Sequence, residues 1–158
     1  MSEQDFDLSS TPRIFFATEF SSKKKAIETL ASILAEQSDF SITDIIEAFM
    51  NRERLGSTAI GNGIAIPHGR IDGIENTMGA LLISQVGLDL QAPDQQPVDI
   101  FFGLILPQEC CDQHLTLLKD IATIASVPDA LEMLRTEKSI KNIFNWISNN
   151  NHQLGEIL

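Results

Sequence analysis

The order of hydrophobic patterns along the chain predicts a single α/β domain, with a mixed β-sheet flanked by helices on both faces. Amphipathic helical patterns come first, apolar strand-like runs occupy the middle, and helical patterns return afterwards. A chain of 158 residues can bury one hydrophobic core. We expect residues 1–10 to form a flexible N-terminal tail, 11–148 to form the domain, and 149–158 to form a polar C-terminal tail.

The first part of the chain predicts a short strand and two helices. The strand covers 13–17, and one of the serines at 21–22 can cap a helix that runs to about Gln37. A second helix begins near residue 41 or 43 and ends before Gly56, a natural helix stop. Apolar residues recur at helical spacing as Ala26, Ile27, Leu30, Ile33 and Leu34, and then as Ile42, Ile45, Ile46, Phe49 and Met50.

The middle of the chain predicts strands, and the last third predicts helices. The strand-like runs are 64–66, closed by Pro67, then 78–86 and 99–106, and nearly continuous apolar runs suit strands buried on both faces. Further helices are expected from Asp112 to about Ser126, from Pro128 through Leu134, and from Ser139 onward, and the polar end from Ser148 is expected to fray. The residues expected to face inward from the first of these helices are Leu115, Leu118, Ile121, Ala122 and Ala125.

Composition and charge exclude several classes of function. Apolar residues make up 43% and charged residues 21%, as in soluble globular proteins, and no apolar run approaches the roughly 20 residues that span a bilayer. The formal net charge of -11 argues against nucleic acid and membrane surfaces as partners, and favours a protein with a basic face. The N-terminus is not a secretory signal, and Cys110 and Cys111 are adjacent and poorly placed to form a disulfide, so we expect a cytoplasmic protein.

His68, one of three histidines, is the first candidate for a functional residue. It lies between Pro67, which stiffens the approach, and Gly69, which we expect to leave the ring unobstructed. The turn Gly-Asn-Gly at 61–63 is expected to bring backbone amides near a ligand, and Arg70 adds a positive charge. Together these groups suit an anion the size of phosphate, although a turn histidine without a role fits the spacing equally well.

His114 is the second candidate, because it lies near the start of a helix that follows a strand, where α/β sheets bind ligands. A plain surface histidine is the alternative, and His152 lies in the polar end without an expected role. Two histidines without cysteine or aspartate at ligand spacing make a poor metal site, and no nucleotide or serine-nucleophile motif is present. No metal or cofactor is expected, and paired histidines with an arginine fit phosphoryl transfer better.

A longer stretch resembles a known family. Residues 52–69 read Arg-Glu-Arg-Leu-Gly-Ser-Thr-Ala-Ile-Gly-Asn-Gly-Ile-Ala-Ile-Pro-His-Gly and resemble the active-site signature of enzyme IIA of the bacterial phosphotransferase system, mannitol/fructose type, especially its nitrogen-regulatory branch. Segments 96–102 and 114–118 resemble the same family, in the expected order. The resemblance covers roughly 11–148, which would be the IIA domain, and its long signature is highly specific.

The resemblance implies roles for three residues. His68 would accept the phosphoryl group on Nε2, His114 would support that group, and Arg52 would be the active-site arginine, with Arg54 as the substitute. The implied donor is a histidine-containing phosphocarrier protein, and the implied output is regulation of target proteins that the sequence does not name. Ala59 departs from the pattern, where nitrogen-type sequences usually have glycine, and would strain the turn if that position had a positive φ.

Two other functions remain open at this stage. A sugar-specific IIA, of fructose or mannitol type, would use the same chemistry to pass phosphate to a IIB component during carbohydrate uptake. The absence of a fused IIB or IIC domain and of a IIB-type cysteine motif favours a standalone regulator. A non-catalytic module that senses an anion at His68 belongs to another class, and would bind anions without forming phosphohistidine.

Overall fold

One mixed sheet forms the centre of the computed structural model, which describes residues 11–109 and 112–158. Its main path runs in the order β1-β5-β6-β3-β2, and β4 pairs with β6. β1 is parallel to β5, β5 is antiparallel to β6, and both β3 and β4 are parallel to β6. The strands are β1 (Ile14–Ala17), β2 (Ala59–Gly61), β3 (Ile64–Ala65), β4 (His68–Ile71), β5 (Met78–Leu88) and β6 (Val98–Pro107).

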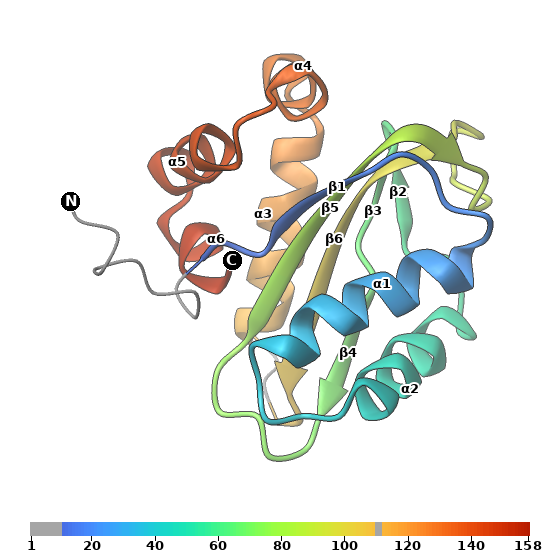
Figure 1. Ribbon diagram of the computed structural model, residues 1–158, viewed down its shortest axis with the longest axis vertical. Coiled ribbons are helices and arrows are strands. Elements are labelled where there is room, and N and C mark those ends of the chain that lie inside the picture. The colour runs from blue at the N-terminus through green and yellow to red at the C-terminus, as the bar shows by residue number, and fades with distance from the viewer. Residues whose placement is uncertain (1–10, 110–111) are drawn as a thin grey trace.

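Helices cover both faces of this sheet, as the sequence predicts (Figure 1). On one face lie α1 (Lys23–Glu36) and α2 (Ile42–Glu53), capped by Ser22 and Ser41. Most of the apolar residues that recur at helical spacing in these two helices lie on one face of each helix, and that face packs on the sheet. The other face carries α3 (Asp112–Ala125), α4 (Pro128–Thr136), α5 (Ile140–Asn150) and α6 (His152–Ile157).

The central strand β6 divides the core by simple alternation. Phe101 and Ile105 face the layer of α1 and α2, whereas Phe102, Leu104 and Leu106 face the layer of α3 to α6. All five side chains are buried. A continuous apolar run is therefore what a strand between two helical layers requires, and the expectation for this run is confirmed.

The C-terminal end differs from the polar, frayed tail expected over 149–158. α5 continues to Asn150, and α6 follows with Leu154 fully buried and Leu158 nearly so. Gly155 fits so closely against α5 that a Cβ there would lie 2.3 Å from the hydroxyl oxygen of Ser148. The few apolar residues of this segment are enough to hold the helix in place, because they complete a core that distant parts of the chain already form.

Arg13 joins the C-terminal end to the rest of the fold. Its guanidinium donates hydrogen bonds to the carbonyl oxygens of Gly79 and Ile157, at 2.9 and 2.7 Å, and to the side-chain oxygen of Gln37 at 2.8 Å. The tail expected over residues 1–10, and Cys110 and Cys111, lie outside the described residues.

The strands β3 and β4 behave as one interrupted strand along β6. Ala65 pairs with Phe101 and His68 pairs with Leu104, so the same register continues across the gap. Pro67 has no N–H to donate, but its carbonyl oxygen accepts a hydrogen bond from the Leu104 amide at 2.9 Å. The strand that the sequence predicts to end at Pro67 therefore resumes at His68.

Candidate active site

His68 is the first residue of β4, not a turn residue, and the strand determines where its side chain points. Ile71 belongs to the core beneath α1 and α2, and Gly69 faces Ala48 of α2. Because strand side chains alternate, His68 and Arg70 point to the opposite face, on the side of α3. Two candidate site side chains thus share one face at the edge of the sheet.

Gly69 serves packing and not only access to the ring. A Cβ at this position would lie 2.7 Å from the carbonyl carbon of Ala48 and 2.8 Å from its Cβ and carbonyl oxygen. Only glycine lets β4 approach the backbone of α2 this closely. Gly69 therefore has a role that the sequence did not indicate: it allows α2 to lie against the strand that carries His68.

The His68 ring is buried, with 9% of the residue exposed, and one of its nitrogens is fixed. Nδ1 lies 2.7 Å from the carbonyl oxygen of Ile66, which can only accept a hydrogen bond. Nδ1 therefore carries the proton in the neutral ring, and Nε2 keeps its lone pair. Burial has the largest effect on the pKa of His68 and lowers it. The hydrogen bond to Ile66 has the next largest effect and raises it, after which Arg52 lowers it, Glu53 raises it and Arg70 lowers it, and the net shift is downward.

His114 lies in the first turn of α3, beside His68. The two ring centroids are 5.3 Å apart, and the planes meet at 78°. The pKa of His114 is lowered by burial and then by His68, Arg70 and Arg52. Its Nδ1 is buried and has no hydrogen-bond partner among the described residues.

Two arginines line the pocket beside these rings. Arg52, in the last turn of α2, donates from Nη1 to the carbonyl oxygen of Gly56 at 3.0 Å. Arg70 donates from Nη1 to the carbonyl oxygen of Gln108 at 3.2 Å. Arg54, the alternative candidate for the active-site arginine, donates a hydrogen bond to the side-chain oxygen of Asn51 and does not line the pocket.

The pocket has a volume of about 380 Å³ and suits an anion. Two arginines and two histidines line it, and no carboxylate is among its described lining residues, although the chain carries a net charge of -11. A larger hollow of about 450 Å³ beside α6 contains Glu75 and Glu156, and neither histidine nor arginine lines it. The lining of the smaller pocket is Ala48, Asn51, Arg52, Leu55, His68, Gly69, Arg70 and His114.

A buried carboxylate organises the chain just after Arg52. Glu53 accepts a hydrogen bond from the hydroxyl of Thr58 and pairs with the ammonium of Lys23, 3.4 Å away. These contacts tie the end of α2 to the start of α1 and to the residue before β2. Because burying a carboxylate without partners is costly, these contacts favour a single backbone conformation for residues 52–58.

The glycine turn at 61–63 lies away from the His68 pocket, contrary to expectation. The amide of Asn62 is already bonded to the carboxylate of Asp94 at 2.8 Å, and its carbonyl oxygen accepts from Arg135 at 2.6 Å. Gly63, with φ of +80°, passes so close to Arg135 that a side chain would not fit. The glycines thus shape the link between β2 and β3, and the turn is not part of the lining of the His68 pocket.

Ala59 causes no strain. It is the first residue of β2, it is buried, and it is not among the described non-glycine residues with positive φ, which are Asn62, Gln91 and Gln95. The departure from the family pattern therefore leaves the geometry near the site intact.

Neither a metal centre nor a membrane span is found in the part of the chain that the structure describes. Residues 11–109 and 112–158 contain no group of three or more metal-ligating side chains. In the same ranges, no helix is long and apolar enough to cross a bilayer.

Comparison with known proteins decides the family. Residues 8–150 match the family described as "Phosphoenolpyruvate-dependent sugar phosphotransferase system, EIIA 2". The chain belongs to this family. It is an EIIA phosphotransferase component, and its single α/β domain has the EIIA fold.

Several relatives of this EIIA protein carry the name "Nitrogen regulatory protein". One from Pseudomonas aeruginosa is 37% identical over 124 residues, which cover 78% of this chain and 80% of the relative. Another from Bradyrhizobium diazoefficiens is 33% identical over 142 residues, which cover 90% and 93%. The crystal structure of nitrogen regulatory protein IIA-Ntr from Neisseria meningitidis matches with a TM-score of 0.79 and 34% identity, covering 83% of this chain and 90% of that one.

The structure brings together His68, His114 and Arg52, the three site residues that the sequence singled out. Arg70, which the sequence expected to add a positive charge beside His68, lines the same pocket, and the structure adds Leu55. Strand alternation would have predicted that Arg70 shares a face with His68, but the sequence indicated a turn there. Leu55 carries no comparable signal, because an exposed leucine at a helix end is common.

Proposed function

We propose that this EIIA protein is a nitrogen-regulatory relay, which accepts a phosphoryl group on His68 and regulates partner proteins according to that state. The nitrogen-regulatory names of the relatives support the regulatory role. The observation that carries the chemistry is a pocket whose described lining includes no carboxylate, and in which a buried imidazole has its Nε2 lone pair available. Its lowered pKa keeps the His68 ring neutral and nucleophilic near pH 7.

The donor is a phosphocarrier protein phosphorylated on its own histidine. The Nε2 lone pair of His68 attacks phosphorus, and the bond between phosphorus and the donor nitrogen breaks, leaving its electron pair on that nitrogen. A donor ring protonated on its other nitrogen departs as neutral imidazole. His68 keeps its Nδ1 proton, held by the Ile66 carbonyl oxygen, so atoms and charge balance.

Arg52 and His114 act on the transferred group. The Arg52 guanidinium offers charge-assisted hydrogen bonds to phosphoryl oxygens, and His114 donates one from a ring nitrogen. Both groups stabilise charge in a phosphoryl-transfer transition state, where positioning and electrostatics supply most of the catalysis.

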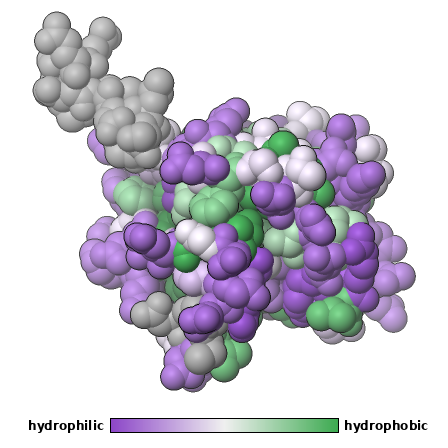
Figure 2. Space-filling model, turned by 90° about the horizontal axis from the view of Figure 1, so that it is seen from below, coloured by the Kyte–Doolittle hydropathy of each residue, from purple (hydrophilic) through white to green (hydrophobic). Residues whose placement is uncertain are grey.

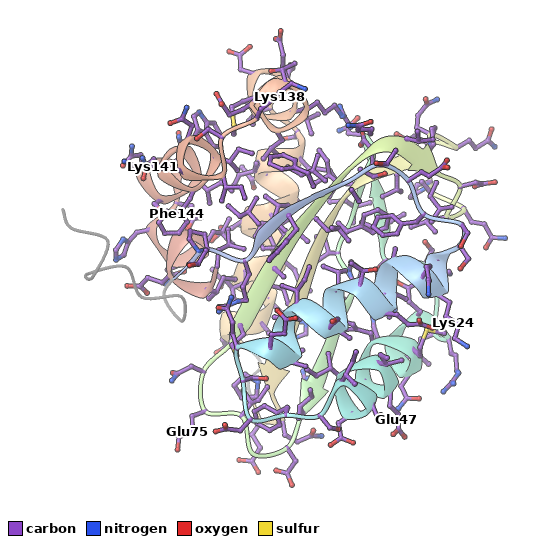
Figure 3. All side chains as sticks on the ribbon, in the orientation of Figure 1. Lys24, Glu47, Glu75, Lys138, Lys141 and Phe144 are labelled. Atoms are coloured by element: carbon purple, nitrogen blue, oxygen red, sulfur yellow. The ribbon has the colours of Figure 1, made fainter. Side chains whose placement is uncertain are left out.

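The surface beside the pocket suits docking of a protein donor. Leu55, on the pocket wall, is 84% exposed, and Leu115, directly after His114, is 65% exposed, although the sequence predicted it to be buried. Seen from below, most of the molecule is hydrophilic with small apolar patches (Figure 2). Glu47 and Glu75 project outward at the lower end of the molecule (Figure 3), so a donor with a basic rim fits this side.

The regulatory output follows from the charge of the phosphoryl group. Phosphorylation adds about -1.5 to -2 charges to a pocket that is otherwise lined by cationic and neutral groups. A target protein that docks over the pocket therefore meets opposite electrostatics in the two states, which gives it a different affinity for each.

The test is phosphorylation by a relay charged with phosphoenolpyruvate, followed by intact-mass analysis. Wild type should gain one acid-labile phosphoryl group, and His68→Ala should gain none. His152→Ala is the matched control, because His152 is exposed on α6 and pairs with Glu156, so it should label normally. Labelling of His68→Ala would contradict the assignment, and transfer onward to a fructose- or mannitol-type IIB protein would indicate sugar transport instead.

A further inference from the structure

Arg70 is placed to act on the same phosphoryl group as Arg52. We propose that Arg70 is a second phosphoryl-binding catalytic residue, whose guanidinium is oriented by the Gln108 carbonyl oxygen and contacts the phosphoryl group while it is on His68. This inference rests on the proposed phosphorylation of His68 and adds a residue to it.

The strand places Arg70 correctly for this role. Two positions separate it from His68 on β4, so the two side chains leave the same face of the strand, and both line the pocket. Arg52 reaches the pocket from the other side, because it comes from α2. The two guanidiniums therefore approach a group on His68 from different elements.

The electrostatic effects on the two rings agree with this arrangement. Arg52 lowers the pKa of His68 more than Arg70 does, whereas Arg70 lowers the pKa of His114 more than Arg52 does. Both arginines therefore lie close enough to both rings to affect a charge placed between them. A phosphoryl group held between the rings would have one arginine on each side.

The hydrogen bonding of Arg70 leaves donors for a ligand. Its one described hydrogen bond runs from Nη1 to the Gln108 carbonyl oxygen at 3.2 Å, and no described carboxylate pairs with it. A guanidinium has five N–H donors in a rigid fork that matches phosphate oxygens. The Gln108 contact therefore fixes the orientation of the fork and leaves other donors for the pocket.

The test compares Arg70→Gln with Arg54→Gln in single-turnover transfer from the charged phosphocarrier. Both variants lose one positive charge close to the site, but Arg54 lies outside the pocket. At saturating donor, we expect Arg70→Gln to slow transfer about tenfold or more and Arg54→Gln to stay near wild type. Arg70→Lys should be intermediate, because an ammonium keeps the charge but not the fork.

A second measurement separates phosphoryl binding from docking. The equilibrium of phosphoryl groups between donor and this protein should shift toward the donor in Arg70→Gln, because the phosphoryl group on His68 loses a contact. Docking affinity does not enter this ratio, so the shift reports on phosphoryl binding alone. An unchanged equilibrium and saturating rate, with only a higher KM, would overturn the inference and make Arg70 a docking residue. If wild type is labelled but Arg70→Gln transfers at the same rate as Arg54→Gln, only this inference is refuted. If wild type is not labelled at all, the proposed function is refuted.

Discussion

Replacing Gly69 with alanine tests whether close packing of β4 on α2 positions His68, the proposed nucleophile. The added Cβ would lie 2.7 Å from the Ala48 carbonyl carbon and 2.8 Å from the carbonyl oxygen. Because carbon atoms pack best at about 3.5 to 4.0 Å, the strand would have to move by roughly 1 Å. The atoms in its way are helix backbone, which cannot rotate aside.

This displacement should affect both stability and transfer. Overpacking of this kind costs about 1–3 kcal/mol of unfolding free energy. His68 precedes Gly69 and would move with it, and a misplacement of about 1 Å can slow a reaction by about 100-fold. Denaturant unfolding and single-turnover phosphoryl transfer measure the two effects separately.

Gly103→Ala is the matched control. Gly103 is buried in β6, and a Cβ there would lie 3.1 Å from Cδ2 of Leu30, the end of a side chain that would need to shift far less than the backbone of α2 beside Gly69. We expect a loss of less than about 1 kcal/mol and nearly normal transfer. If Gly69→Ala behaved like Gly103→Ala in both assays, the packing of Gly69 on α2 would not position His68.

Two further predictions concern pH and the C-terminal helix. In an NMR titration, the His68 ring should reach half-protonation only below pH 6.5, its ordinary pKa, because burial lowers the pKa; half-protonation at or above 6.5 would contradict that effect. Since the unfolded chain then binds the proton more readily, stability should fall as the pH falls from 6.5 through the lower folded pKa. Leu154→Ala should cost about 2–5 kcal/mol by denaturant unfolding, because Leu154 is fully buried. Leu115→Ala, at a 65% exposed position, should change the unfolding free energy by less than about 0.5 kcal/mol. A loss as small as this for Leu154→Ala would mean that α6 is not part of the core.

The sequence by itself determined the features that depend on neighbours along the chain. Helical spacing and serine caps predicted α1 and α2, and the continuous apolar run of 99–106 predicted a strand buried on both faces. The long signature of 52–69, which contains Arg52 and His68, predicted the family, and the resemblance implied the role of His114. These signals are local because period, capping and motif spacing are read within one segment.

The tertiary structure decided what depends on partners far away in the chain. β4 forms because β6 offers it an edge for pairing beyond Pro67. α6 packs on the domain because Leu154, Ile157 and Leu158 complete a core built by distant parts of the chain. The glycine turn at 61–63 is bound to Asp94 and Arg135, distant residues that no local pattern links to it. The sequence named Arg70 as a positive charge near His68, but the way it reaches the pocket depends on distant contacts: pairing with β6 makes His68 part of a strand, and strand alternation then turns Arg70 toward the pocket.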